Sequence, residues 1–217
     1  MSGYQTIADL PKRLAVFPLG GALLFPRMQL PLNIFEPRYL NMIDDAMSGD
    51  RLIAMVQPLT DHENRAAPRL AKVAGLGRIT SYSETDDGRY LITLTGLCRA
   101  RIVDELGLPK PYRTVSADYA DYAADFAPDD GAETIDREGL LGALDRFVRR
   151  NGYQADWNAA QAAPMEMLVN ALCAACPFAL AEKQALLEAP DLAARADLLG
   201  RLLDLNSGGA AQGDSIQ

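Results

Sequence analysis

The residues with the plainest chemical potential are two cysteines separated by two alanines, Cys173 and Cys176. A C-x-x-C pair can form a redox-active dithiol or supply half of a zinc site. The third cysteine of the sequence, Cys98, stands alone in a strand-like run, so the other half of a zinc site is missing. Both paired cysteines also fall on the apolar face of a predicted helix, where a free thiol behaves as a small hydrophobic group. We therefore expect them to pack in a core.

Other catalytic arrangements have little support in the sequence. The single histidine, His62, lies in a polar segment beside Glu63, where a solvated loop residue is the ordinary interpretation. The glycine pair Gly20-Gly21 lacks the lysine and hydroxyl residue of a phosphate-binding loop. Three pairs of adjacent aspartates are typical of solvated turns, linkers and helix surfaces: Asp44-Asp45, Asp86-Asp87 and Asp129-Asp130. These patterns give little support for catalysis, and we expect no metal or cofactor.

A proline-rich apolar stretch at positions 14–39 favours binding instead. Its four prolines break the run into short extended pieces, because proline fixes φ and cannot donate to a strand ladder. A folded-back ribbon of this kind can close a small β-barrel or leave a groove for an extended peptide. The candidate peptide-binding residues are Phe25, Met28, Leu32, Phe35, Arg38, Tyr39, Arg99 and Arg101.

Two interpretations of these residues remain open. Arg99 and Arg101 are two apart on a predicted strand and so share one face, where they could pair with a peptide carboxylate, an acidic client or a phosphate. Alternatively, the aromatic residues fill the core, as large apolar side chains usually do, and the arginines pair with nearby carboxylates.

The remaining pattern of the first half predicts many short strands and one helix. The helix begins near Pro37 and ends before Gly49, and the turn at Asp86-Asp87-Gly88 predicts a hairpin. This arrangement is typical of a small, curled β-barrel or a split sheet. The predicted strands are 14–19, 30–35, 51–57, 73–83, 89–95, 97–104 and 113–119.

The second half has a different pattern. Residues 121–138 are acidic and contain Pro128 and Gly131, so we expect a linker there. Apolar stripes at helical spacing follow, which predicts a helical bundle over residues 139–206. Residues 207–217 are rich in glycine, alanine and serine and are expected to be disordered. The fold class predicted is therefore α+β, with a β domain at 1–120 followed by the bundle.

Composition places further limits on function. Of the 217 residues, 49% are hydrophobic and 23% are charged, as in an ordinary globular protein. No apolar run approaches the ~20 residues that cross a bilayer, and the N-terminus lacks the features of a signal peptide. Three cysteines do not describe a disulfide framework. We expect a cytoplasmic protein that does not bind membranes.

The net charge of −8 is unevenly distributed. Residues 1–117 carry 14 basic and 12 acidic side chains, whereas the rest of the chain carries 7 and 17. Negative charge disfavours non-specific contact with nucleic acid, and the near-neutral first half lacks a clear basic stripe. Nucleic acid is therefore not the expected partner.

Three sequence blocks carry a family resemblance. They are F-P-L…L-F-P-x-M-x-L-P-L-x-I-F-E-P-R-Y at positions 17–39, GLGRITSYSETDDGRYLITLTGLCRARIVDE at 75–105 and CPFALAEKQALLEAPDLAARADLL at 176–199. In this order they resemble the N-terminal substrate-binding domain of Lon-type ATP-dependent proteases, and most of all the stand-alone bacterial proteins made of this domain. The resemblance covers most of residues 13–204. It implies a PUA-like β-barrel, and the recognition part of the protease without its ATPase or peptidase module.

We therefore expect a non-catalytic module that binds unfolded or extended polypeptide in protein quality control. A protease or chaperone is its expected partner. The alternative is an RNA-binding protein, because PUA-like barrels also occur in that class. A small-molecule pocket is a third, less supported interpretation, and the sequence does not indicate the oligomeric state.

Overall fold

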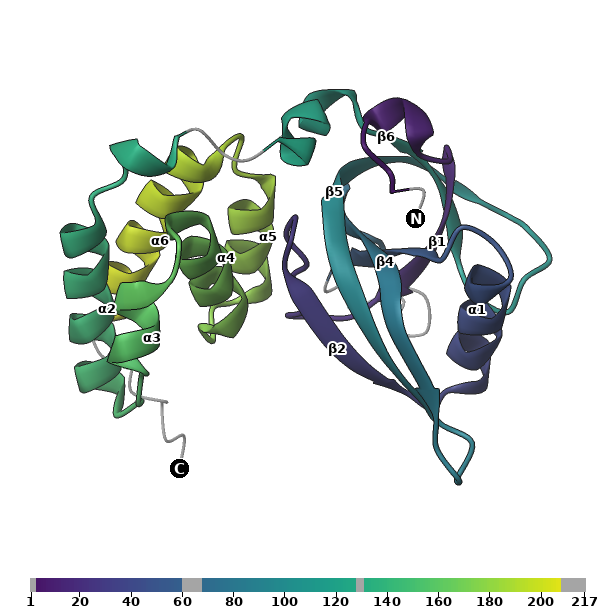
Figure 1. Ribbon diagram of the computed structural model, residues 1–217, viewed down its shortest axis with the longest axis horizontal. Helices are drawn as coiled ribbons and strands as arrows, with labels where there is room; N and C mark the ends of the chain where they lie inside the picture. The colour runs from purple at the N-terminus through teal and green to yellow at the C-terminus, as the bar shows by residue number, and fades with distance from the viewer. Residues whose placement is uncertain (1–2, 60–67, 128–130, 208–217) are drawn as a thin grey trace, which may run out of the picture. The chain divides into compact units, whose positions relative to one another are not determined.

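The computed structural model describes residues 3–59, 68–127 and 131–207, so His62 and the predicted disordered residues 208–217 lie outside the described part. The chain divides into two compact units (Figure 1). The β unit comprises Met1–Pro128 and Ala179–Glu188, and the helical unit comprises Asp129–Phe178 and Ala189–Gln217. The predicted mixed α+β class is confirmed.

The β unit is built on one sheet of six strands: β1 (Arg13–Pro18), β2 (Gln29–Ile34), β3 (Leu52–Val56), β4 (Val73–Glu84), β5 (Tyr90–Leu106) and β6 (Thr114–Asp118). Their order is β2-β5-β4-β3-β1-β6. The β1–β3 pair is parallel, and the other neighbours are antiparallel. Since β6 also pairs with β5, the pairings that run through β4, β3, β1 and β6 return to β5.

Strand β5 is one continuous element where the sequence predicted two strands separated at Gly96. Its first half pairs with β2 and its second half pairs with β6. Gly96 does not break the strand. A Cβ at this position would lie 1.9 Å from the carbonyl oxygen of Phe25, so the glycine is needed for a close backbone approach.

The segment between β1 and β2, residues 19–28, is called the ribbon below. It crosses the sheet where β4 and β5 carry glycines. A Cβ at Gly75 would lie 2.0 Å from the Leu24 carbonyl oxygen, and one at Gly77 would lie 2.5 Å from the Leu24 side chain. Leu24 and Phe25 are consequently buried almost completely. The ribbon is therefore a core element of the β unit.

Helix α1 (Pro37–Met47) packs on the sheet beside this ribbon. Pro37 occupies the first turn, where its missing N–H costs no hydrogen bond. Tyr39, Met42 and Ile43 recur at helical spacing and are buried in a cluster with β-strand side chains such as Ile53.

Besides α1 and the short 3-10 helix η1 (Ile7–Asp9), the β unit contains two further helices. The 3-10 helix η2 (Ala120–Phe126) lies almost entirely in the segment 121–138 predicted as a linker, and helix α5 (Leu180–Glu188) comes from the predicted helical bundle. The α5 residues Lys183 and Gln184 donate hydrogen bonds to the carbonyls of Gly21 and Val73, at 3.0 and 3.1 Å. Hydrogen bonds to distant backbone, which periodicity does not reveal, hold α5 in this unit.

The helical unit contains α2 (Arg137–Asn151), α3 (Trp157–Ala162), α4 (Met165–Ala175) and α6 (Leu192–Asn206). Asp136, Asp156 and Asp191 precede α2, α3 and α6, and each side chain accepts a hydrogen bond from a backbone N–H three residues later. Helices α2 and α6 pack together, and α4 packs against α6. Within the described ranges, no helix is long and apolar enough to span a membrane.

Candidate functional site

The structure separates the predicted peptide-binding residues into three groups. Phe25, Tyr39 and Arg99 are buried, and Met28 and Leu32 are half-buried. Phe35, Arg38 and Arg101 are exposed. The eight residues therefore do not form one continuous surface.

Arg99 forms a buried ion pair. Its guanidinium donates to both carboxylate oxygens of Asp125, at 3.0 and 2.8 Å, and to the Leu187 carbonyl of α5 at 3.2 Å. The guanidinium also lies over the ring of Tyr122, 4.5 Å from its centroid. These contacts join β5, η2 and α5, so Arg99 has a structural role in the β unit.

Arg101 reaches the same 3-10 helix as Arg99, as expected of two arginines on one strand face. It pairs with Asp121 at 2.5 Å, but both side chains of this pair are about half exposed. The arginines thus pair with local carboxylates, in the manner of the second interpretation that the sequence left open. Asp121 and Asp125 lie in the segment predicted as a linker, so the sequence did not indicate that they pair with these arginines.

Arg38 and Tyr39 contribute to a small pocket in the β unit. Arg38 pairs with Glu36 at 2.8 Å, and its guanidinium lies 4.6 Å from the centroid of the Tyr39 ring. Tyr39 packs against Phe17 with ring centroids 4.3 Å apart, and burial raises its pKa above the ordinary value. The pocket has a volume of about 190 Å³, smaller than typical ligand sites. It is lined by Pro18, Arg38, Tyr39, Pro58, Pro68, Pro111, Tyr112 and Arg113.

Phe35 is the most accessible of the predicted residues, with 62% of its surface exposed. It directly follows β2, which pairs only with β5 within the described part of the chain. Leu91 of β5, the cross-strand partner of Asn33, is also exposed and lies at the same end of the β2–β5 pair. Leu91 was not among the residues predicted from the sequence, because its exposure depends on which face of β5 is covered.

The open edge of β2 presents backbone groups as well. The Gly96 amide donates to the Met28 carbonyl at 2.8 Å, so the alternating ladder turns the backbone groups of Gln29, Pro31 and Asn33 outward. Pro31 supplies only its carbonyl there, and its missing N–H costs no bond to β5. This edge offers acceptors at three positions and donors at two of them.

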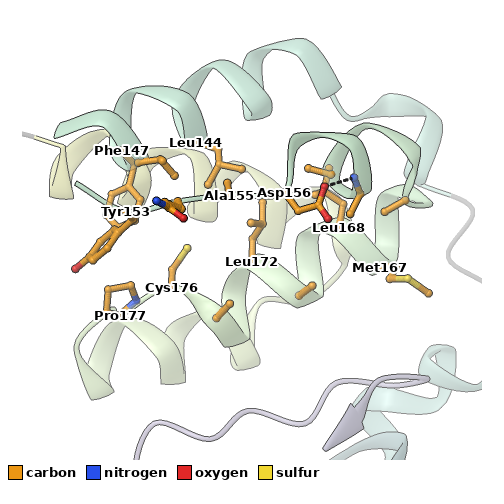
Figure 2. Close-up of a pocket in the computed structure, with 17 residues that line it drawn as sticks. Leu144, Phe147, Tyr153, Ala155, Asp156, Met167, Leu168, Leu172, Cys176 and Pro177 are labelled. Carbon is orange, nitrogen blue, oxygen red and sulfur yellow. Dashed lines mark hydrogen bonds between the residues drawn. The ribbon is translucent and has the colours of Figure 1, made fainter. Parts of the chain in front are cut away.

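The helical unit contains a larger pocket, with a volume of about 770 Å³ (Figure 2). Its walls come from α2, the turn after α2, α3 and α4. In the view of Figure 2, Tyr153 and Met167 lie at opposite ends, with Leu172 between them. The full lining is Leu144, Phe147, Val148, Tyr153, Gln154, Ala155, Asp156, Ala159, Ala160, Ala163, Met167, Leu168, Ala171, Leu172, Ala175, Cys176 and Pro177.

Specific contacts hold the walls of this pocket. Arg137, the first residue of α2, donates hydrogen bonds to the Ala160, Gln161 and Ala163 carbonyls at the end of α3, at 2.7–3.2 Å. Gly152 ends α2 with φ of +69°, a left-handed conformation that suits glycine. The turn brings the Tyr153 ring to 5.6 Å from that of Phe147.

Sequence reasoning missed this pocket. A capping aspartate followed by W-N-A-A-Q-A was a usable signal for α3, but the sequence does not show that its alanines face those of α4. Only the packing of the two helices creates the pocket.

The cysteines offer little reactivity in their surroundings. Burial, together with the Asp125 carboxylate, raises the pKa of the Cys98 thiol to about 12, so this thiol stays protonated at neutral pH. Cys173 and Cys176 are buried and not joined in a disulfide, and Cys176 lines the helical-unit pocket. Across the described ranges, no three His, Cys, Asp or Glu side chains gather as a metal site. Binding of apolar groups is the chemistry that these surfaces favour.

Comparison with solved structures shows a shared fold. The Lon N-terminal domain protein from Xanthomonas campestris has a TM-score of 0.59 and 20% identity, and the match covers 86% of this chain and 96% of that one. The N-terminal domain of Mycobacterium avium complex Lon protease has a TM-score of 0.63 and 17% identity, with 88% and 98% covered.

Comparison with curated sequences finds Lon proteases. The chain is 28% identical over 204 residues to Lon protease 2 of Myxococcus xanthus, which covers 90% of this chain and 24% of that protein. It is 25% identical over 199 residues to the Lon protease of Dictyoglomus thermophilum, which covers 86% and 24%. The chain thus spans about a quarter of the length of these relatives. The family model of the ATP-dependent protease La (LON) substrate-binding domain matches residues 13–204, so the chain belongs to this family.

Proposed function

We propose that this chain is a non-catalytic module that binds apolar segments of unfolded or extended polypeptides at the β2 edge. Membership of the substrate-binding domain family supports a role in recognising polypeptides. The exposure of Phe35 supports the location of this binding site, because the side chain is 62% exposed directly after an edge strand. An exposed aromatic side chain beside open backbone groups suits weak recognition of many sequences.

The proposed mode of binding is addition of a strand to β2. The outward carbonyls of Gln29, Pro31 and Asn33, and the N–H groups of the first and third, would bond to the backbone of the client. Phe35 and Leu91 would cover apolar client side chains. Backbone pairing does not depend on client sequence, whereas the apolar contacts favour segments that a folded protein would bury.

Affinity at this site is expected to be modest. Burying one Phe-sized side chain contributes about 1.5–3 kcal/mol, and Pro31 removes one donor from the edge. Weak binding allows a client to be released or passed on. The Lon names of the curated relatives support a role beside a protease in protein quality control.

The remaining predicted features also belong to this proposal. The closed cycle of strand pairings supports a PUA-like β-barrel. The RNA-binding alternative has little support, because many cationic groups of the described β unit have carboxylate partners. These pairs are Arg38–Glu36, Arg89–Asp87, Arg99–Asp125, Arg101–Asp121, Lys110–Asp45 and Arg113–Glu105.

Binding of a permanently unfolded probe tests the proposal. Fluorescein-labelled α-lactalbumin, reduced and carboxymethylated, is titrated with the full chain and followed by fluorescence anisotropy. Phe35→Asp should weaken binding by about tenfold or more, because a charge replaces the apolar contact.

Val103→Asp is the matched control. Val103 is 56% exposed on the half of β5 that pairs with β6, away from β2. This variant should bind the probe within about twofold of the wild-type chain, as a surface change outside the site. The proposal is wrong if Phe35→Asp binds like the wild-type chain while circular dichroism shows that both variants are folded.

A further inference from the structure

We propose that the helical-unit pocket is a separate docking groove for an amphipathic α-helix that carries a lysine or arginine beside its apolar face. This inference does not depend on the proposed function of the β2 edge. It rests on the lining, wall structure and charge of the 770 Å³ pocket, which no part of the β-edge proposal uses. Its occupant is a helix of a partner protein.

The walls favour a helix over an extended segment. They are formed largely by α2, α3 and α4, whose backbone groups are bonded within each helix. An extended peptide in this groove would bury backbone N–H and C=O groups without partners, at about 1–3 kcal/mol each. A helix satisfies its own backbone and buries only side chains.

The size of the lining side chains fits the same occupant. Small residues allow close approach of helix axes, and larger residues at the ends can contact the apolar stripe of a docked helix. Met167, which is 53% exposed, and Tyr153 occupy the two ends in Figure 2. The small residues of the lining are Ala155, Ala159, Ala160, Ala163, Ala171 and Ala175.

The charge of the groove favours a basic residue on the helix. Asp156 is the only charged residue of the described lining. One of its oxygens accepts the Ala159 N–H at 2.9 Å, and no described residue forms an ion pair with it. The helical unit as a whole has 12 acidic and 6 basic residues. A lysine or arginine near Asp156 would therefore find a carboxylate free of a competing cation.

The arginines of α2 do not form ion pairs with the Asp156 carboxylate. Each of the four has a partner within the helical unit. Arg137 donates to the carbonyls at the end of α3, and Arg150 donates to the Ser207 carbonyl. Arg146 pairs with Asp204, and Arg149 pairs with Asp145. The groove therefore combines an apolar floor with one unneutralised carboxylate, which is complementary to a basic amphipathic helix.

Three synthetic probes test the occupant by fluorescence anisotropy with the full chain. The first is an alanine-based peptide of about 14 residues, or four turns, with a leucine stripe, flanking lysines and a hydrocarbon staple on the opposite face. The second has the same sequence except for a central proline, and it has no staple. The third replaces the lysines with glutamates. The first probe should bind at least about tenfold more tightly than the second, because proline breaks the helix.

Variants of the chain test the location. Met167→Glu and Ala159→Phe should each weaken the first probe by about tenfold, by adding a charge or filling the groove. Both residues are exposed, so the changes leave the core intact. Leu205→Glu is the matched control, since Leu205 is 72% exposed on α6 and does not line the groove. It should bind within about twofold of the wild-type chain.

Asp156→Asn tests the charge without removing the helix cap, because asparagine also caps helices well. It should weaken the lysine probe by about threefold and abolish the preference over the glutamate probe. Equal binding of the helical and proline-containing probes, no binding of the first probe, or normal binding by Met167→Glu and Ala159→Phe would each overturn the proposal. Phe35→Asp should leave binding of the first probe unchanged, so the failure of one site is distinguishable from failure of the other.

Discussion

The Arg99–Asp125 pair shows how a residue selected for binding can have a structural role. The side chains are only 4% and 8% exposed, and two hydrogen bonds join them. The Asp125 carboxylate also accepts the backbone N–H of Arg99 at 2.8 Å. Such a network offsets the cost of taking two charges out of water. The sequence could place Arg99 on a strand, but not beside a carboxylate 26 residues away.

Removal of one partner from this pair should destabilise the protein strongly. We expect Asp125→Ala to lower the free energy of unfolding by about 3–5 kcal/mol, because it leaves the Arg99 guanidinium buried without its anion. The double variant Arg99→Met/Asp125→Leu should recover much of this loss. Urea unfolding followed by circular dichroism measures both effects.

The neighbouring pair is a suitable control. Arg101–Asp121 is half exposed, so Asp121→Ala should cost no more than about 1 kcal/mol. Equal losses for Asp121→Ala and Asp125→Ala would contradict the assignment of Arg99 and Asp125 as a buried structural pair.

At the level of elements, the ribbon before β2 depends on glycines in other strands. Pro18 ends β1 and Pro26 lies in the turn before β2, as a run broken into short pieces requires. Pro31 does not break the run, because it lies inside β2, and Pro37 begins α1. The β4–β5 register shifts between Leu76 and Gly77. The glycines at 75 and 96 are needed for another reason, the close approach of the Leu24 and Phe25 carbonyls. A local pattern cannot show this, because the contacting segment is far away in sequence.

A methyl group at Gly96 should therefore displace the ribbon. A Cβ there would lie 1.9 Å from the Phe25 carbonyl oxygen, so Gly96→Ala should lower the free energy of unfolding by about 3 kcal/mol through overpacking. Gly107→Ala, at a position with no atom within 4 Å of the added Cβ, should have little effect. Urea denaturation of both variants gives the comparison, and similar stabilities would show that the ribbon can move at little cost.

At the level of the whole molecule, the two units are not consecutive in sequence. The β unit takes α5 from between two segments of the helical unit. Leu186 and Leu187 of α5 are almost completely buried, and Lys183 and Gln184 bond to β-unit carbonyls. The sequence predicted a single boundary in the acidic segment, because composition changes there. It could not assign α5, because the backbone groups that hold this helix in the β unit lie in segments distant in sequence.

The position of α5 predicts the behaviour of a truncated chain. Residues 1–128 alone should be less stable than the same residues joined by a glycine–serine linker to residues 179–188, by at least about 3 kcal/mol from the lost apolar burial and hydrogen bonds. Hydrogen exchange at β4 and β5 measures the difference, since these strands receive α5 contacts. Equal protection in both chains would show that α5 is dispensable for the β unit.

The sequence by itself determined the features that depend on near neighbours. Aspartate caps start α2 and α6, Pro37 starts α1, and Pro18 ends β1, because capping and φ restriction act within a few residues. The three family blocks also identified the substrate-binding domain family that the match over residues 13–204 shows.

Only the tertiary structure decided which residues are accessible and which helices belong together. Phe25 and Phe35 have the same side chain, yet Phe25 is fully buried in the β unit and Phe35 is 62% exposed. The partner of Arg99, the assignment of α5 and the alanine-lined groove likewise depend on segments distant in sequence. Burial is a property of the packed chain, because it is the contact of distant segments that removes a side chain from water.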